Sequence, residues 1–380
     1  IETNGLLDDT TTIHALVIQD FDTHKVYSCT DNSPDFMPIQ EGLKMLEEAD
    51  LIIGHNILCF DLPVIHKLYP SFQERGTVRD TLTISRLVYP NMIDIDYARS
   101  RGPHKDKFFL PVKLYGRHSL ESWGYRLSEK KGEFCHETDW HNWSPEMQSY
   151  CEQDVKVTAC LWEHFLQMDY SPVAIELEHQ FQKVIFQQER NGFPFNYEAA
   201  SKLYSDLCAE RETLRQNLCS LFPPKDYGDW FTPKVNNKTK GYVKGVQIWR
   251  PKVRAFNPGS RDEIAERLIE KYNWKPTDIT DSGKPKVDED ILDALPYPEA
   301  KQLARFFLLQ KRLGQIGEGA QAWLKTAKKE TNEDGETIYR IHGRVTTNGA
   351  VTGRCTHHDP NLAQVPAVGV PWGEECRSLF

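Results

Sequence analysis

The segment Leu51-Ile-Ile-Gly-His-Asn-Ile-Leu-Cys-Phe-Asp61 indicates the fold of the first part of the chain. Leu51 to Ile53 is an apolar run of strand length, and Gly54 ends it. Asp61 then opens a segment with helical spacing of apolar residues. A buried strand followed by a helix that begins with an acid is typical of an α/β domain. We therefore expect Asp61 to lie near the end of that strand.

The segments on either side of this stretch continue the alternation of strands and helices. Strands are predicted at 14–18 and 26–27. Helices are predicted at 39–48, 61–68, 81–88, 119–127 and 144–167. The last two begin at serine caps, and Pro145 follows Ser144 at the first helical position. Residues 1–170 thus predict an α/β domain, with a mixed sheet flanked by helices.

The pattern changes after about residue 174. Helical spacing dominates 174–220, except at 191–194, and returns at 260–271 and 298–329. Between them lies a loop-rich segment, 222–259, in which Lys and Arg are interleaved with aromatic residues. Such a mixture suits a nucleic-acid or partner surface. It equally suits a solvated loop whose aromatics fix it to the body, and the sequence leaves both interpretations open.

Composition narrows the class of protein. The chain has 380 residues and a formal net charge of −9, which argues against a surface covered by DNA-binding charge but allows a local basic groove. No apolar run approaches the roughly 18–20 residues of a membrane span, and no secretory signal opens the chain. Nine scattered cysteines without a CxxC pair favour a reduced cytoplasmic protein. The start at Ile1 suggests that the natural N-terminus lies upstream.

Four residues from three distant segments are candidates for catalysis: Glu2, Asp61, Tyr150 and Asp154. Tyr150 and Asp154 are four apart on a predicted helix and therefore share a face. Hard divalent cations need carboxylate oxygens, which Glu2, Asp61 and Asp154 could supply. Each signal alone is modest, because such pairs often decorate a surface and a lone acid often caps a helix. Their order along the chain strengthens the hypothesis.

That order resembles the DEDD exonuclease superfamily, in the subclass with tyrosine in its third motif. Asn56-x-x-x-Phe60-Asp61 matches the second motif and Tyr150-x-x-x-Asp154 the third. The first motif is Asp-x-Glu; Glu2 matches its Glu, so its Asp would fall one residue before Ile1. The resemblance implies an RNase H-like fold, two Mg²⁺ or Mn²⁺ ions held by Glu2, Asp61 and Asp154, and a DNA contact at Asn56.

Segments farther along the chain resemble the family A (Pol I-like) DNA polymerases. They include 189–194, 256–261, 309–324 and Asn348-Gly-Ala-Val-Thr-Gly-Arg354, followed by 359–366. Within that family the chain is most similar to the replicative enzymes of short-tailed phages of the T-seven type. The resemblance implies an exonuclease domain at 1–170, a mostly helical thumb at 171–340 and the start of an α+β palm at 341–380. It also implies that Arg344, Arg354 and Asn361 contact primer–template DNA.

The expected function is proofreading in phage DNA replication, by two-metal hydrolysis at a single-stranded 3′ end of DNA. The protein is expected to be monomeric and not to associate with a membrane. The resemblance puts the first polymerase Asp beyond Phe380, so this chain is expected to lack the nucleotidyl-transfer site. The phage enzymes that the chain resembles carry a long thumb insert that binds thioredoxin. The corresponding segment is much shorter here, which argues against thioredoxin as a partner. Two alternatives stay open: a stand-alone DEDD nuclease that trims RNA, and an inactive scaffold that binds DNA.

Overall fold

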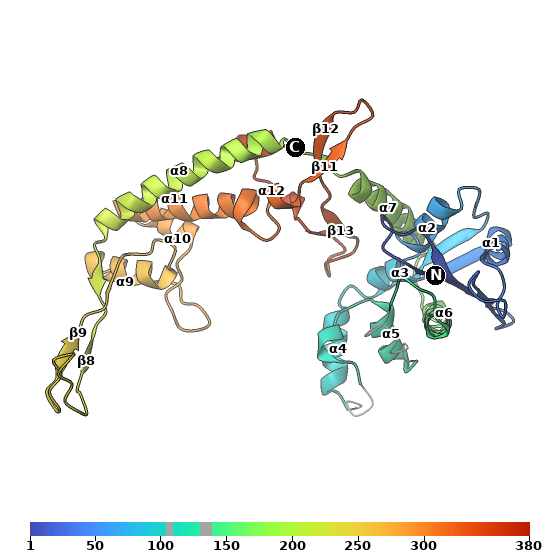
Figure 1. Cartoon of the computed structure of the whole chain (residues 1–380), viewed down its shortest axis with the longest axis horizontal. Helices are drawn as coiled ribbons and strands as arrows, with labels where there is room; N and C mark the ends of the chain where they lie inside the picture. Colours follow the sequence, from blue (N-terminus) through green and yellow to red (C-terminus); the bar gives the residue numbers. More distant parts are fainter. Residues whose placement is uncertain (104–108, 130–138) are drawn as a thin grey trace. The chain divides into compact units, whose positions relative to one another are not determined.

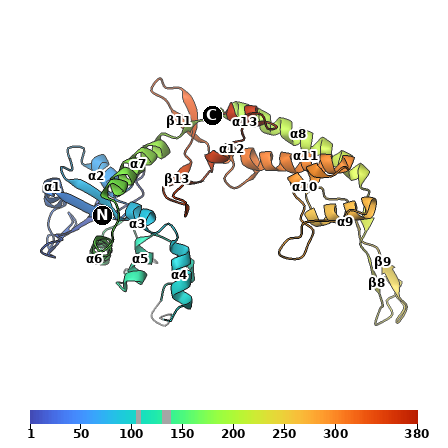
Figure 2. The same cartoon turned by 180° about the vertical axis from the view of Figure 1, so that it is seen from behind.

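The computed structural model describes residues 1–103, 109–129 and 139–380 of the chain. The chain divides into two compact units. The first contains 1–191 and 343–358, and the second contains 192–342 and 359–380. Figures 1 and 2 show the elements of both units from opposite sides. The expected boundaries at 170/171 and 340/341 do not coincide with this division, because the helix after 171 and the segment 343–358 belong to the first unit.

The strands of the first unit form two hydrogen-bonded groups. The antiparallel group has the order β1-β2-β3, and β4 pairs with β5 in parallel. Their bounds are β1 Glu2–Thr3, β2 Ile13–Gln19, β3 Val26–Cys29, β4 Leu51–Gly54 and β5 Thr77–Asp80. Parallel and antiparallel pairs are both present, as expected, but not within one continuous sheet. A cavity lined by 16–19 of β2 and by β4 lies between the two groups.

Helices cover these strands. Helix α6 contacts β1, β2, β3 and β4, while α1 contacts β2 and β3. The bounds are α1 Ile39–Glu48, α2 Asp61–Leu68, α3 Thr81–Val88, α4 Met92–Arg101, α5 Leu120–Leu127, α6 Pro145–Leu166 and α7 Pro172–Asn191. The predicted caps are confirmed: Ser119 accepts a hydrogen bond from Ser122 N, and Ser144 accepts one from Met147 N.

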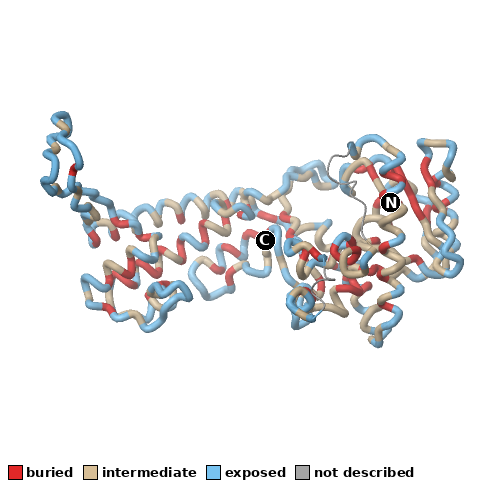
Figure 3. The backbone as a smooth tube through the Cα atoms, turned by 90° about the horizontal axis from the view of Figure 1, so that it is seen from below, coloured by how far each residue is buried: buried red, intermediate tan, exposed pale blue. Residues whose placement is uncertain are grey.

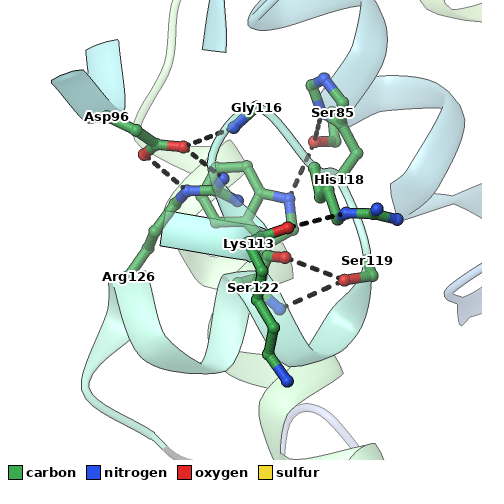
Figure 4. A network of polar contacts seen from close by, with 10 residues as sticks. Ser85, Asp96, Lys113, Gly116, His118, Ser119, Ser122 and Arg126 are labelled. Carbon is green, nitrogen blue, oxygen red and sulfur yellow. Dashed lines mark hydrogen bonds and ion pairs between the residues drawn. The ribbon is translucent and has the colours of Figure 1, made fainter. Parts of the chain in front are cut away.

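A buried polar network fixes α5 against α3 and α4 (Figure 4). Arg126 and Asp96 form a two-point ion pair, with side chains 1% and 0% exposed. Asp96 also accepts a hydrogen bond from Gly116 N at 2.9 Å. Ser85 Oγ lies 2.6 Å from His118 Nδ1 and accepts a hydrogen bond from Trp123 Nε1 at 2.8 Å. These partners repay part of the desolvation of the network, although Arg126 Nη1 is buried without a hydrogen-bond partner.

The second unit is rich in helices, with α8 packed along α11 (Figure 1). Its helices are α8 Tyr197–Leu221, α9 Arg261–Tyr272, α10 Glu289–Ala294, α11 Pro298–Leu313, α12 Trp323–Thr326 and α13 Gly373–Arg377. Buried positions recur along the long helices (Figure 3). They include Leu207 and Leu218 of α8 and Leu303 and Leu309 of α11. The two helices thus bury one stripe each in two cores that they share, one with Leu218 and Leu303 and the other with Leu207 and Leu309.

The helical pattern expected over 298–329 is present but interrupted. Helix α11 ends at Leu313, and a π-helical turn, Gly314–Glu318, follows it. Glycine destabilises a helix interior, and three glycines between 314 and 319 favour the break. The chain then enters a three-stranded sheet made of β6 Phe193–Pro194, β11 Lys328–Thr331 and β12 Thr337–Ile341.

Within the described ranges, no helix combines the length and apolar character needed to cross a membrane.

Candidate active site

Three of the four candidate catalytic residues meet at one cavity in the first unit. Glu2 lies on β1, Asp61 is the first residue of α2, and Asp154 lies in the middle of α6. All three line a cavity of about 760 Å³. Three acidic side chains from segments far apart in sequence thus face a common space.

Helix α6 supplies two of the candidates. Its buried stripe, which includes Val157 and Leu161, packs inward, and its contacts with the strands fix its rotation. Tyr150 and Asp154 lie one helical turn apart on this helix. Tyr150 is 7% exposed, and its ring meets Trp140 edge-on at 6.2 Å. Among the described residues that line the cavity, Asp154 is present and Tyr150 is not.

A tight turn after β4 delivers Asp61 to the cavity. Asn56 adopts φ +64°, a left-handed conformation that asparagine tolerates better than most residues. The carboxylate of Asp80, at the end of β5, accepts hydrogen bonds from Asn56 N at 2.9 Å and from Leu58 N at 3.2 Å. It also caps α3 by accepting from Leu82 N at 2.8 Å. One buried side chain therefore fixes both the turn that leads to Asp61 and the start of α3.

Histidine 179 supports Asp80 from helix α7. His179 Nε2 accepts the backbone N–H of Asp80 at 2.7 Å, and Nδ1 lies 2.8 Å from Ile175 O. This pattern requires a neutral ring with the proton on Nδ1, and burial lowers the pKa of His179 accordingly. Burial also raises the pKa of the Asp80 carboxyl, although the backbone N–H groups that it accepts act in the opposite direction.

The cavity wall carries negative charge, at Glu2, Asp61 and Asp154. The backbone nitrogen of Ile1 lies 2.9 Å from Asp61 Oδ1. Burial raises the pKa of the Cys151 thiol to about 12, and Glu2, Asp154 and Asp61 contribute to the rise. Cys151 thus lies within the electrostatic reach of all three acids.

The donor chemistry around the cavity fits a hard divalent cation, since carboxylate oxygens are the ligands that Mg²⁺ and Mn²⁺ prefer. In the described part of the chain, however, no three His, Cys, Asp or Glu side chains come close enough to share one metal ion. The acids therefore face the cavity without forming a closed ligand set.

The residues predicted to contact primer–template DNA belong to both units. Arg344, on β13 (Arg344–Thr346), and Arg354 are exposed residues of the first unit, and Arg354 Nε donates to Thr352 Oγ1 at 3.3 Å. Asn361 belongs to the second unit, where its Oδ1 accepts from Ala363 N at 3.1 Å. Asn361 therefore caps a short 3₁₀ turn, while both arginines present their charge to solvent.

The catalytic hypothesis from sequence missed Asp80 and Cys151 as parts of this site. The triplet Asp80-Thr81-Leu82 carries a usable signal, because an Asp before a helical pattern favours an N-cap. The sequence gives no such local signal for the hydrogen bonds that Asp80 accepts from the turn at 56–58. Cys151 follows Tyr150 directly, but nothing in the sequence distinguishes it from an ordinary buried thiol.

Comparisons with known proteins agree with this architecture. The sequence model of DNA polymerase family A matches residues 234–380. The chain is 34% identical to a DNA-directed DNA polymerase of Escherichia phage T7 and 33% identical to that of Enterobacteria phage T3. Both alignments include the whole chain, which spans 64% of the length of each relative.

The fold also has a solved counterpart. It is similar to the POL domain of Pol1 from M. smegmatis, solved in complex with DNA primer-template and dNTP. The TM-score is 0.58 at 15% sequence identity, over 98% of this chain and 52% of the other. At that identity the likeness concerns the fold alone. The two phage relatives and the match over residues 234–380 make the chain similar in sequence to family A DNA polymerases.

Proposed function

We propose that the first unit is the 3′→5′ proofreading exonuclease of a phage-type replicative DNA polymerase, acting on the single-stranded 3′ end of DNA. One observation carries the proposal: Glu2, Asp61 and Asp154 line a single cavity although they come from three distant segments. These positions match the acidic motifs of DEDD exonucleases. The similarity of this chain to family A polymerases supports DNA rather than RNA as the substrate.

Glu2, Asp61 and Asp154 would hold the divalent cations, two Mg²⁺ or Mn²⁺ ions in the proposal. When bound, such ions make a water nucleophilic at neutral pH and neutralise charge on the leaving oxygen. The protein's own part is to hold the acids in place. Asp80 fixes the turn before Asp61, and α6 fixes Asp154. Tyr150, one turn from Asp154, would orient the attacking water.

The remainder of the chain is proposed to serve DNA binding. Residues 192–342 would act as the thumb, and the segment that follows would open the palm. Arg344 and Arg354 are exposed, and guanidinium groups suit phosphate contacts. Asn56 and Asn361 are weaker candidates, since a strained turn and a cap already account for them. A related fold in complex with primer–template DNA supports this part of the proposal.

The test is degradation of a single-stranded DNA oligomer labelled at its 3′ end. The chain would be assayed as it stands and with one Asp added directly before Ile1, each with Mg²⁺, with Mn²⁺ and with EDTA. We expect metal-dependent shortening that is much faster after the addition, because the Asp-x-Glu pair is then complete. Asp61→Asn and Asp154→Asn should reduce the rate to background.

Asp94→Asn is the matched control, since Asp94 is an exposed acid on α4, away from the cavity. It should leave the rate unchanged. Full activity in Asp61→Asn, or no shortening by the folded, Asp-extended protein, would contradict the proposal and favour an inactive scaffold. Faster cleavage of a matched RNA oligomer would instead favour an RNA-trimming nuclease.

A further inference from the structure

Segment 343–358 joins residues far upstream in the first unit by packing against helix α7. Glu189 Oε1 accepts a hydrogen bond from Val345 N at 2.6 Å, and Gln182 Oε1 accepts one from Thr347 Oγ1 at 2.9 Å. Glu189 and Gln182 are seven residues apart on α7 and therefore lie on the same face of the helix. One face of α7 thus holds the segment.

The amide of Gln182 also reaches the turn that leads to Asp61. Its Nε2 donates to Cys59 Sγ at 3.3 Å, and Cys59 lies two residues before Asp61. Gln182 is 6% exposed and Thr347 is 0% exposed, so the hydrogen bond between them is shielded from water. Removing one partner of a buried hydrogen bond leaves the other unsatisfied, which costs free energy. A single side chain therefore connects segment 343–358 with the turn before Asp61.

Helix α7 supports this turn at a second point. His179, three residues before Gln182, accepts the backbone N–H of Asp80. The carboxylate of Asp80 in turn accepts two N–H groups of the turn, as described above. Helix α7 thus holds the turn directly, through Gln182, and indirectly, through Asp80.

We propose that Gln182 is a positioning residue of the candidate exonuclease site, and that it makes the position of Asp61 depend on the docking of segment 343–358. The inference rests on the function proposed above and adds a control of that site. Among the described residues that line the cavity, Gln182 and Thr347 are both absent, so they act through the turn. When the segment leaves α7, Gln182 loses the partner that orients its amide toward Cys59, and Asp61 loses one of its two supports from α7.

The first measurement is hydrogen exchange of the amides at 57–62 in the chain as it stands, followed by mass spectrometry. Gln182→Met keeps the length of the side chain but removes both hydrogen bonds, and Thr347→Val keeps the shape of threonine but removes the donor. Each should speed exchange at 57–62 by roughly five- to tenfold, because a lost buried hydrogen bond makes local opening easier.

Two further variants test the route of this effect. Thr347→Ser keeps the hydroxyl and should exchange like the unchanged protein. In the double variant, Thr347→Val should add nothing to the effect of Gln182→Met, because Thr347 acts through that side chain.

The second measurement is hydrolysis of the 3′-labelled single strand by the Asp-extended protein with Mn²⁺. In Gln182→Met, kcat should fall about tenfold while KM for the oligomer stays within about twofold, because the change displaces an acid without touching the DNA. A purely structural role would lower the midpoint of denaturation and leave kcat of the folded protein unchanged. Gln187→Met is the matched control, since Gln187 is an exposed glutamine of α7 that donates to Asn191 on the same helix. It should change neither exchange at 57–62 nor kcat.

Unchanged exchange at 57–62 in both single variants would overturn the proposal, whatever the rate of hydrolysis. Additive effects in the double variant, or faster exchange with an unchanged kcat, would also overturn it. Absence of hydrolysis in the unchanged, Asp-extended protein would instead contradict the function proposed above. The exchange result would then still decide whether Gln182 connects the turn with segment 343–358, so the two failures are distinguishable.

Discussion

Replacing Arg126 with Met should destabilise the first unit by about 3–5 kcal/mol, the cost of breaking a buried ion pair. Arg126 donates to Asp96 at 3.0 and 2.7 Å, and neither side chain reaches solvent. After the change, the fully buried Asp96 carboxylate would keep only the N–H of Gly116. Methionine fills much of the volume of the arginine side chain. The loss of stability would therefore come more from the unpaired charge of Asp96 than from a cavity.

The measurement is native-state hydrogen exchange of the amides in α5, which reports the opening free energy of this region without requiring two-state unfolding of the whole chain. The double variant Asp96→Leu/Arg126→Met should recover most of the loss, because removing both partners strands no charge. Recovery should stop about 1 kcal/mol short, since Gly116 N–H loses its acceptor. A single-variant loss below about 1 kcal/mol, or no recovery in the double variant, would refute the reasoning.

Three further results are expected. Burial and the charges of Arg86 and Arg126 lower the pKa of His118 to about 4, so its proton binds mainly in the unfolded state. The free energy of opening of α5 should therefore be highest above about pH 6.5 and fall by about 3 kcal/mol toward pH 4. If a His118→Gln variant shows the same fall, His118 is not its source. Asp80→Asn should cost about 1–3 kcal/mol by denaturant titration of the first unit, because an amide accepts fewer of the three N–H groups. Leu309→Ala should cost the second unit about 2–5 kcal/mol in the same assay, and no loss would mean that α11 does not bury this side chain.

Local signals made much of the fold predictable. Helix α6 was expected at 144–167 and runs from Pro145 to Leu166, because its cap, its proline and its apolar spacing all lie within the segment. The helical pattern expected over 298–329 did not reveal the interruption after Leu313, where glycines favour a break. The division into units was also beyond local reasoning, since it depends on segment 343–358 joining residues far upstream.

The sequence proposes the residues of the candidate site but not their arrangement. The spacing of Tyr150 and Asp154 predicts a shared face, and the structure has both on α6. That Glu2, Asp61 and Asp154 line one cavity depends on how β1, α2 and α6 pack, which no local pattern encodes. The role of Asp80 was hidden for the same reason, because its partners lie more than twenty residues away.

A buried thiol in each unit can report how often the structure around it opens. Burial raises the pKa of Cys151 to about 12 in the first unit and that of Cys376 to about 11 in the second. At neutral pH both are protonated and shielded, so a thiol-specific alkylating reagent can reach them only when the surrounding structure opens. Labelling followed by mass spectrometry of the two cysteine peptides would time the opening of each unit separately in one sample.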